Sequence, residues 1–348
     1  MAIKVLIVDD SALMRQLLGE IVAAAPDLEV VGSAADALAA REMIKALNPD
    51  VVTLDIEMPG MDGLAFLERL MKLRPMPVVM ISALTARGSE ATLKALELGA
   101  VDFVAKPRAA SSGELQGYAD EIREKIRAAC GAHLRRRAPA VAGPAGRPSV
   151  RAGGLPAPQL AERLVAIGAS TGGTEAIKEV LVRLPAEVPG IVIVQHMPET
   201  FTPSFARRLD GLGAVRVVEA RGGERIEPGH AYLAPGHSHL LVKRCGGGWV
   251  TELQQSAPVN RHRPAVDMLF YSVAREAGDR AIGVILTGMG KDGAQGMLAM
   301  KQAGAWNIGQ DQESCVVYGM PREAVLAGAI DEVSSLPDIA GRILAKLR

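Results

Sequence analysis

The sequence predicts an α/β protein of two units, each built on a largely parallel sheet. Short apolar runs alternate with amphipathic stretches along the chain, which is typical of a parallel sheet with helices on both faces. A stretch rich in Ala, Pro, Gly and Arg interrupts this alternation between Arg135 and Pro158. The 348 residues are enough for two domains at about 150 residues each.

Five apolar runs in the first third of the chain predict a five-stranded parallel sheet. The predicted strands are Lys4–Val8, Leu28–Gly32, Asp50–Leu54, Pro77–Ile81 and Asp102–Ala105. Amphipathic stretches such as Ala12–Ala24 and Leu64–Leu73 lie between them and predict helices. Ser11 stands at the N-cap position of the first of these helices.

Alternation resumes at Leu164 and predicts a second, doubly wound and mostly parallel sheet. The runs Ile191–Val194 and Ile282–Leu286 are almost wholly apolar, as buried parallel strands are. Helical patterns cover Glu175–Leu184, Pro264–Ala277 and Ala294–Ala303. Between Ile226 and Leu253 paired β-type segments with glycine turns predict a β-hairpin excursion.

These patterns predict three parts: residues 1–130, a linker of residues 131–160, and residues 161–348. The linker composition cannot bury enough apolar surface to offset the entropy of ordering, so we expect a flexible segment. Its arginines at 135–137 suit contact with nucleic acid, but a basic helix end beside a solvated linker is the simpler interpretation.

Composition excludes several classes of function. Lysine plus arginine and aspartate plus glutamate number 39 each, so no overall field attracts nucleic acid or an anionic membrane. The three cysteines form no C-x-x-C pair, which argues against a disulfide framework and a zinc site. No segment approaches the roughly 18 consecutive apolar residues of a membrane helix. We therefore expect a soluble, cytoplasmic protein that neither binds nucleic acid nor inserts into a membrane.

Charged side chains follow the predicted strands of the N-terminal unit where each strand ends. Asp9 and Asp10 follow the first strand, Asp55 the third, Ser82 the fourth and Lys106 the fifth. Three carboxylates at one sheet edge would repel one another unless a hard cation such as Mg²⁺ neutralised them. With the lysine and the hydroxyl to receive oxygens, this edge suits uptake of a phosphoryl group. Taken singly, each acid is equally well explained as a helix N-cap.

At these residues the first third of the chain resembles the receiver domain of two-component response regulators. The matching pieces are Val8–Ser11, Leu54–Gly63, Ser82-Ala83 and Lys106-Pro107. The resemblance implies a flavodoxin-like fold and phosphorylation of Asp55.

The resemblance to receiver domains also implies a magnesium site and a set of pocket residues. Mg²⁺ would be held by Asp10, Asp55 and the backbone carbonyl of Glu57. Phe103 stands at the aromatic switch position of that family. The pocket residues implied beside the phosphorylated aspartate are Asp9, Asp10, Ser82, Lys106 and Phe103.

Ser170 lies where the apolar run Leu164–Ile167 breaks into small residues. Gly168 and Gly172 remove the side chains that would crowd its hydroxyl, and glycine tolerates the backbone angles of a sharp strand-to-helix turn. The turn therefore suits a nucleophile. A glycine-rich turn of this kind equally suits a phosphate-binding or a purely structural role, and other residues must decide.

A serine nucleophile needs a base and an acid that orients the base. His196 directly follows the buried strand Ile191–Val194, which places it at the same sheet edge as Ser170. Asp292 follows the strand Ile282–Leu286 through a glycine-rich turn whose N–H groups suit an oxyanion hole. The plain alternative is that Asp292 is the N-cap of the next helix, and the two roles are compatible. We expect the other histidines to be hydrogen-bonded surface or core residues: His133, His230, His237, His239 and His262.

The order of these residues separates the chain from two better-known patterns. Gly168–Gly172 matches the nucleophile elbow of α/β-hydrolases, in which the acid precedes the histidine. Here the order is serine, histidine, acid, which indicates a different lineage of esterase. A dinucleotide site is disfavoured because the sequence has no G-x-G-x-x-G, and the next strand ends at His196 with no acid for a ribose.

At these motifs the C-terminal half resembles the catalytic domain of chemotaxis protein-glutamate methylesterases. The motifs are Ala166–Gly173, Gln195–Pro198, Leu286–Ala294 and Tyr318–Pro321. The resemblance implies Ser170 as the nucleophile, His196 as the general base and then acid, and Asp292 as the acid that orients His196. It also implies the Met289 N–H as an oxyanion donor, with Thr171 in support.

The two resemblances together imply a phosphorylation-activated hydrolase of chemotactic adaptation. It would demethylate glutamate γ-methyl esters and deamidate selected glutamines in the cytoplasmic helices of chemoreceptors, with a chemotaxis histidine kinase as phosphodonor and no cofactor for the esterase step. Two alternatives remain. A DNA-binding response regulator would carry a short helix-turn-helix after the linker, whereas about 190 residues of α/β pattern follow. A non-enzymatic receptor-docking regulator would release no methanol.

Overall fold

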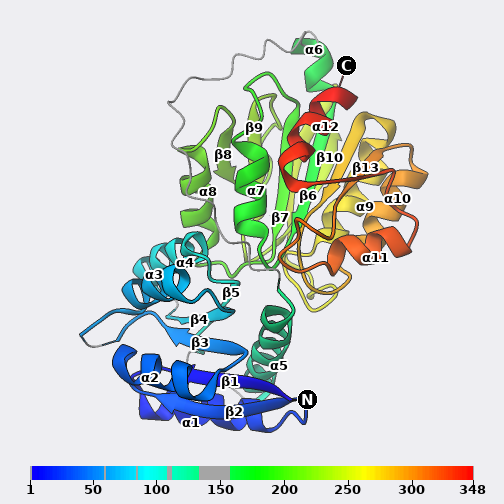
Figure 1. The fold of residues 1–348 in the computed structure, drawn as a ribbon. Helices are drawn as coiled ribbons and strands as arrows, with labels where there is room; N and C mark the ends of the chain where they lie inside the picture. The colour runs from blue at the N-terminus through cyan, green and yellow to red at the C-terminus, as the bar shows by residue number, and fades with distance from the viewer. Residues whose placement is uncertain (1, 59, 84, 108–111, 133–156, 348) are drawn as a thin grey trace. The chain divides into compact units, whose positions relative to one another are not determined.

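The computed structural model describes residues 2–58, 60–83, 85–107, 112–132 and 157–347 (Figure 1). The chain divides into two compact units, residues 1–136 and 137–348. Most of the predicted linker, including His133, lies outside the described residues. Each unit is built on a parallel sheet with helices, which confirms the predicted fold class. Within the described ranges, no helix has both the length and the apolar character needed to cross a membrane.

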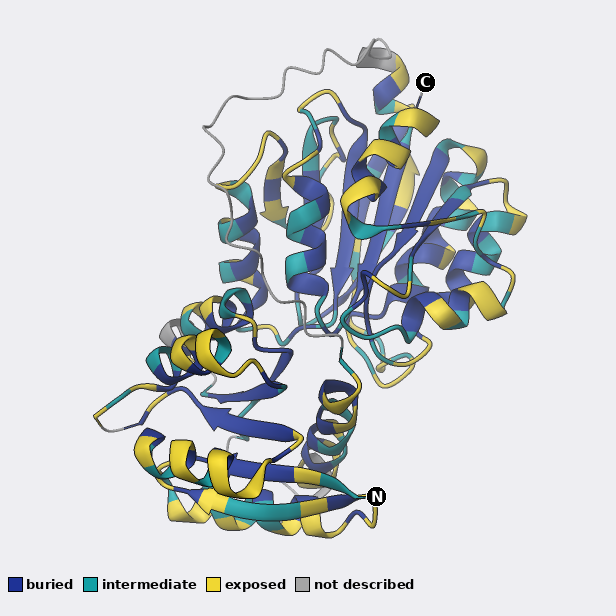
Figure 2. Ribbon diagram, in the orientation of Figure 1, coloured by how far each residue is buried: buried dark blue, intermediate teal, exposed yellow. Residues whose placement is uncertain are grey.

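The N-terminal unit is a five-stranded parallel sheet in the order β2-β1-β3-β4-β5. Its strands are β1 Ile3–Val8, β2 Leu28–Ala34, β3 Val51–Asp55, β4 Val78–Ser82 and β5 Asp102–Ala105. Its helices are α1 Ala12–Ala23, α2 Ala37–Leu47, α3 Gly63–Leu73, α4 Ala86–Leu98 and α5 Ser112–Cys130. Strands β3 and β4 are buried at every residue, because helices cover both faces of the sheet (Figure 2).

Side-chain caps fix where the helices of the N-terminal unit begin. Ser11, Asp36, Asp62 and Thr85 each accept a hydrogen bond from the backbone N–H three residues further on. These residues satisfy N–H groups that a helix start would otherwise leave without an acceptor. Each cap lies in the connection that follows a strand, so the caps hold the turns at the carboxyl edge of the sheet.

The C-terminal unit is a seven-stranded sheet in the order β14-β13-β12-β6-β7-β9-β8, parallel throughout. Its strands are β6 Leu164–Ala169, β7 Gly190–Gln195, β8 Arg216–Glu219, β9 His230–Leu233, β12 Ala281–Ile285, β13 Trp306–Gln310 and β14 Glu332–Ser334. Its α-helices are α6 Ala157–Ala161, α7 Gly173–Leu181, α8 Thr202–Asp210, α9 Val266–Glu276, α10 Ala294–Gln302, α11 Met320–Leu326 and α12 Ile339–Lys346. Short 3₁₀ helices cover Gly278–Arg280 and Leu336–Asp338.

The predicted hairpin is present but shorter than the segment that suggested it. β10 His239–Cys245 and β11 Gly248–Gln254 form a separate antiparallel pair. They are joined by Gly246 and Gly247, whose positive φ angles of 54° and 79° suit a tight hairpin turn. β9 lies in the same predicted segment, yet it joins the parallel sheet between β7 and β8. A run of four residues is too short for its pattern to reveal its partner.

Two glycines let helix α9 lie close to the elements that carry the site. A Cβ on Gly296 of α10 would lie 2.7 Å from the Phe270 Cβ of α9. A Cβ on Gly168 of β6 would lie 2.3 Å from Cγ1 of Val266, the first residue of α9. The N-terminus of α9 therefore meets both the start of α10 and the end of β6.

Candidate active site

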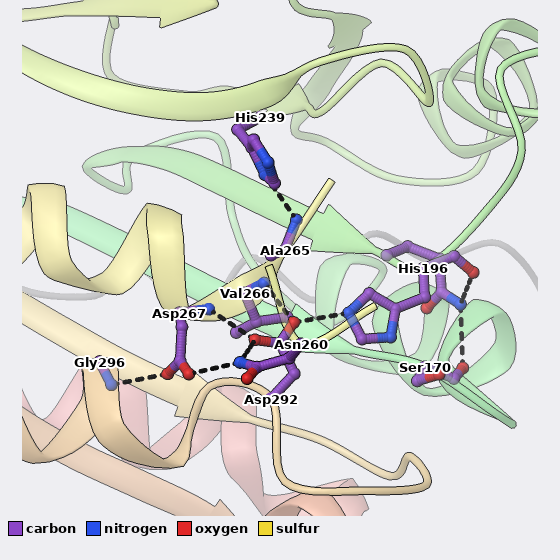
Figure 3. A network of polar contacts seen from close by, with 10 residues as sticks. Ser170, His196, His239, Asn260, Ala265, Val266, Asp267, Asp292 and Gly296 are labelled. Atoms are coloured by element: carbon purple, nitrogen blue, oxygen red, sulfur yellow. Dashed lines mark hydrogen bonds and ion pairs between the residues drawn. The ribbon is translucent and has the colours of Figure 1, made fainter. Parts of the chain in front are cut away.

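Ser170 and His196 lie at the carboxyl ends of adjacent parallel strands. β6 and β7 pair through Ala169 and Gln195, so the residues that follow them are neighbours across the sheet edge. The His196 N–H donates to the Ala169 carbonyl oxygen at 3.1 Å. The Gln195 side-chain amide donates to the Ser170 carbonyl oxygen at 2.9 Å. Figure 3 shows the two predicted catalytic side chains at this edge.

The turn after Ser170 accepts only glycine at two positions. Gly172 has a φ of +75°, and a Cβ there would lie 2.6 Å from the Val316 Cβ. A Cβ on Gly173 would lie 2.1 Å from the Gln195 Oε1. Helix α7 can therefore start three residues after Ser170, whose side chain stays partly exposed between buried neighbours. The hydroxyl is thus presented at the rim of the sheet.

His196 and Asp292 are in direct contact. His196 Nε2 lies 2.8 Å from Asp292 Oδ2, and their side chains are 6% and 1% exposed. Because a carboxylate only accepts hydrogen bonds, the contact places the neutral imidazole's proton on Nε2 and its lone pair on Nδ1. Nδ1 is buried and has no hydrogen-bond partner among the described residues. The ring is therefore set up to accept a proton at Nδ1, the nitrogen on the Ser170 side in Figure 3.

The Asp292 carboxylate accepts four hydrogen bonds. Oδ2 accepts from His196 Nε2 and, at 2.6 Å, from the Val266 N–H. Oδ1 accepts from Asn260 Nδ2 at 2.8 Å and from the Asp267 N–H at 3.1 Å. Burial alone would raise the pKa of Asp292, but the hydrogen bond and charge of His196, with the hydrogen bonds of Asn260 and Val266, lower it to about 2. Asp292 is therefore ionised at neutral pH.

Asp292 caps a different helix from the one that the sequence suggested. Helix α10 has Gly293 as its N-cap, with no side-chain cap hydrogen bond, so the alternative role as the α10 cap is wrong. The carboxylate instead binds the N–H groups of Val266 and Asp267, the first two residues of α9. The positive end of that helix favours a negative charge there. The partners lie 25 and 26 residues away, beyond the reach of a local capping pattern.

The turn after β12 lies against Ser170. The Ser170 N–H donates to the Thr287 carbonyl oxygen at 3.1 Å, and a Cβ on Gly288 would lie 2.8 Å from the Ser170 Cβ. The Met289 N–H, the predicted oxyanion donor, has no acceptor among the described residues. Thr171, the predicted support, is buried, and its carbonyl oxygen accepts from Thr287 Oγ1 at 3.0 Å. The turn therefore brings a backbone N–H without an acceptor close to the serine.

The ring of His262 lies beside the predicted base, because it stacks on the ring of His196. The ring centroids are 3.7 Å apart and the planes differ by 13°. His239 is the buried, hydrogen-bonded core residue that was expected, since its ring contacts the Ala257 carbonyl oxygen and accepts from the Ala265 N–H, both at 3.1 Å. The place of His262 beside His196 was not predicted, because no strand end or motif marks this residue.

The N-terminal unit brings three of the predicted acids and the lysine together. Lys106 Nζ lies 2.8 Å from Asp55 Oδ2 and 3.0 Å from Asp9 Oδ2, and both acids are buried. Exposed Asp10 completes a group in which one oxygen of each carboxylate lies within 4.8 Å of the others. Burial raises the pKa of Asp55, and Lys106 partly opposes that rise. A site with only oxygen donors is the type that Mg²⁺ prefers.

The other predicted pocket residues take different positions. Ser82 is buried, and its hydroxyl accepts from Thr92 Oγ1 of α4 at 2.7 Å, so its hydrogen bonds lead toward α4. The Asp55 carboxylate accepts a hydrogen bond from the Ile56 N–H at 2.8 Å, and Glu57 is the next residue along the chain. Phe103 is buried on β5, with the Lys125 ammonium 5.0 Å from its ring centroid.

Two protein families match the two units. The response regulator receiver domain matches residues 5–115, and the CheB methylesterase matches residues 165–343. Fold and site together therefore define a response regulator whose second unit is a hydrolase of the methylesterase type.

Individual relatives extend the match over nearly the whole chain. A protein-glutamate methylesterase/protein-glutamine glutaminase of Nitrosomonas europaea is 62% identical over 99% of this chain and 96% of its own. A protein of the same name from Dechloromonas aromatica is 61% identical over 98% and 97%. The crystal structure of the Thermotoga maritima CheB methylesterase catalytic domain matches with a TM-score of 0.52 and 40% identity, over 53% of this chain and 98% of that domain. The chain belongs to the family of CheB methylesterases that carry a response regulator receiver domain, the protein-glutamate methylesterase/protein-glutamine glutaminases.

Proposed function

We propose that this protein is a phosphorylation-activated hydrolase of chemotactic adaptation. It demethylates glutamate γ-methyl esters and deamidates selected glutamines in the cytoplasmic helices of chemoreceptors. The names of its relatives support both activities. The observation that carries the proposal is the contact of His196 with Asp292 at the sheet edge that also bears Ser170. A hydroxyl, an imidazole and a carboxylate in this arrangement are what acyl transfer from an ester requires.

The first half of the proposed reaction forms an acyl-enzyme. Ser170 Oγ attacks the ester carbonyl carbon while its proton moves to Nδ1 of His196. The carbonyl oxygen becomes an oxyanion that the Met289 N–H stabilises, with Thr171 supporting the turn. The ionised Asp292 stabilises the imidazolium through the Nε2–H. The C–O bond to methanol then breaks, methanol leaves with the proton from Nδ1, and the glutamyl group stays bonded to Ser170.

The second half releases glutamate. His196 takes a proton from water through Nδ1 as the water oxygen attacks the acyl carbon. The bond to Ser170 Oγ breaks, and the serine recovers its proton from His196. With a glutamine side chain the same sequence expels ammonia in place of methanol. The proposed step uses these side chains and water, and no cofactor.

The receiver pocket fits a phosphorylation site with a bound cation. The three carboxylates there offer only oxygen donors, and the Lys106 ammonium contacts two of them, which leaves negative charge for a hard cation. We propose that Asp10, Asp55 and the backbone carbonyl of Glu57 hold Mg²⁺. When bound, Mg²⁺ would neutralise charge on an incoming phosphoryl group.

The proposed modification is transfer of a phosphoryl group from a chemotaxis histidine kinase to Asp55. Lys106, beside Asp55 and Asp9, would then bind a phosphoryl oxygen. The Ser82 hydroxyl would reach the phosphoryl group by turning away from α4. Phe103 would be the aromatic switch residue that responds to phosphorylation.

The proposed domains are a receiver of residues 1–130, a linker of residues 131–160 and a catalytic domain of residues 161–348. Phosphorylation of the first would raise the rate of the last. We propose that the protein acts in the cytoplasm, because its proposed substrates and phosphodonor lie there, and that it needs no nucleic acid or membrane insertion.

Methanol release from methylated chemoreceptor tests the proposal directly. The full chain should release methanol, faster with Mg²⁺ and a small phosphodonor such as acetyl phosphate, and Asp55→Asn should abolish only the increase. Ser170→Ala should lower the rate by at least a thousandfold, whereas the matched control Ser204→Ala on helix α8 should leave it unchanged. A wild-type protein that binds receptor but releases no more methanol than Ser170→Ala would instead be a non-enzymatic docking regulator.

A further inference from the structure

A tight turn before helix α9 reaches the catalytic acid and base from outside the sheet edge. Val259 and His262 close the turn, because the N–H of each donates to the carbonyl oxygen of the other, at 3.0 and 2.9 Å. The central residues, Asn260 and Arg261, have φ angles of 52° and 67°. This is the left-handed pair of a type I′ turn, which a residue such as arginine adopts only when its surroundings enforce it. Strain of this kind often accompanies a functional site.

The turn places the side-chain amide of Asn260 between two buried carboxylates. Asn260 Nδ2 donates to Asp292 Oδ1 at 2.8 Å and to Asp267 Oδ2 at 2.7 Å (Figure 3). The two acids are 2% and 5% exposed. Both hydrogens of one amide nitrogen are therefore used to hold two acids together.

Asp292 and Asp267 cap helices reciprocally: the acid before α10 binds the start of α9, and the acid in α9 binds the start of α10. Asp292 precedes α10 and binds the first N–H groups of α9, as described above. Asp267 lies in the first turn of α9, and its Oδ1 accepts from the Gly296 N–H in the first turn of α10 at 2.7 Å. The amide of Asn260 links these reciprocal caps. Without it, the two buried carboxylates would face each other with no side-chain donor between them, and such pairs hold a shared proton.

We propose that Asn260 is a positioning residue for the catalytic acid. Its amide fixes Asp292 Oδ1 so that Oδ2 faces His196, and it takes the place of the proton that Asp292 and Asp267 would otherwise share. The inference rests on the proposed function and adds a residue to its machinery. The other end of the same turn is His262, stacked on His196, so one turn contacts both the acid and the base.

The pKa of Asp267 supports this arrangement. Burial and the charge of Asp292 raise it, against hydrogen bonds from Gly296, Asn260 and Gly293. Of the two acids, Asp267 is thus the one that takes up a proton more readily. A cavity of about 450 Å³ reaches Asn260 and Asp267 from the side of α10 and α11. Among the described residues, the titratable groups in contact with Asp292 are His196 and Asp267. His262 stacks on His196, and Lys291 and Glu323 line the cavity beside Asn260 and Asp267.

The pH dependence of kcat/KM for methanol release by the full chain tests the role of Asn260. In Asn260→Ala the two acids lose their shared donor, so the pair should take up a shared proton within the assayed pH range and Asp292 should carry less negative charge beside His196. We expect kcat to fall at least tenfold at neutral pH. We expect the acid limb of the pH profile of kcat/KM, where the rate falls with falling pH, to move up by at least one pH unit. Asn260→Asp keeps the shape but places a third carboxylate beside the pair, so it should lose still more activity.

A double variant separates the electrostatic role from a structural one. Adding Asp267→Asn to Asn260→Ala removes the second charge, so the acid limb should return to the wild-type position even if kcat recovers only in part. The exposed amide Gln255 lies in the same connection, and Gln255→Ala should match wild type in rate and pH profile. Thermal unfolding of each variant checks that it is folded.

The outcomes distinguish this inference from the proposed function. If Ser170→Ala released methanol at the wild-type rate, the proposed function itself would fail. If Ser170→Ala were inactive while folded Asn260→Ala and Asn260→Asp kept the wild-type kcat and acid limb, only the inference would fail. A lower melting temperature with an unchanged pH profile would show that Asn260 serves the fold alone, and would overturn the inference.

Discussion

Replacing Asp292 by asparagine should separate the two tasks of this carboxylate, orienting His196 and capping α9. Each of its oxygens accepts two hydrogen bonds, from His196 and Val266 at one and from Asn260 and Asp267 at the other. An asparagine has one oxygen and one NH₂ group. In either orientation of the asparagine side chain, its NH₂ group therefore faces two of the N–H donors that the carboxylate oxygens accept from in the wild type.

The structure sets the size of the stability loss. Each buried donor left without an acceptor costs about 1–3 kcal/mol, so two of them cost about 2–6 kcal/mol. The pKa gives a second figure, because the difference between the ordinary value of 3.8 and about 2 corresponds to about 2 kcal/mol. Since the folded-state pKa is the lower one, this contribution is complete above the ordinary pKa and is lost as the pH falls toward 2. The stability difference between wild type and Asp292→Asn should therefore shrink with acid.

The rate should fall much further than the stability. With the charge gone, the imidazolium loses its counter-ion and His196 is no longer held with its lone pair on Nδ1. We expect kcat for methanol release to fall about a thousandfold to ten-thousandfold, the loss that Ser-His-Asp enzymes show on this substitution. Urea unfolding is followed by tryptophan fluorescence, which reports on the C-terminal unit alone because Trp249 and Trp306 are the two tryptophans of the chain.

A matched control distinguishes loss of chemistry from loss of a capping bond. Asp210 Oδ1 accepts from the Val217 N–H at 2.9 Å, which is a carboxylate-to-backbone bond in the same unit. Asp210→Asn should lower stability and leave kcat unchanged. A folded Asp292→Asn protein that kept more than a tenth of the wild-type kcat would refute the assignment of Asp292 as the orienting acid.

Two further changes test other parts of the account. Lys106→Ala removes the ammonium at 2.8 Å from Asp55, so the N-terminal unit should lose about 3 kcal/mol of unfolding free energy at neutral pH. Mg²⁺ should restore part of this loss. Calorimetry that showed no difference between Mg²⁺ and chelator would contradict the proposed cation site. Gly172→Ala places a Cβ 2.6 Å from the Val316 Cβ at a φ of +75°, so the rate of methanol release should fall at least tenfold. The matched control is Gly246→Ala, where φ is +54° and no atom lies within 4 Å of the added Cβ. It should lower stability and leave the rate of methanol release unchanged.

Much of the site could be predicted because parallel strands bring their carboxyl ends to one edge. Ser170 and His196 follow paired strands, so their neighbourhood follows from the strand pattern. The same rule gathers Asp9, Asp55 and Lys106 in the N-terminal unit. Apolar runs that end in chemically active residues were therefore a reliable signal in both units.

The rest of the site depends on contacts that no local pattern reveals. Asp292 caps α9 rather than the helix that follows it, because the two helices lie close together in space. Asn260 and His262 reach the site through a turn whose central arginine has a positive φ angle, which its residue type does not suggest. β9 looked like part of a hairpin and joins the parallel sheet, since a strand of four residues carries too little pattern to assign a partner.

The central claim is that Ser170 carries the acyl group during ester hydrolysis. Acid quenching of the full chain during turnover of a methylated receptor peptide, followed by mass spectrometry of its fragments, tests this claim most directly. The fragment containing Ser170 should gain the mass of the peptide minus methanol, and Ser170→Ala should show no such gain. An acyl group found on another residue, or rapid methanol release by the Ser170→Ala protein, would contradict it.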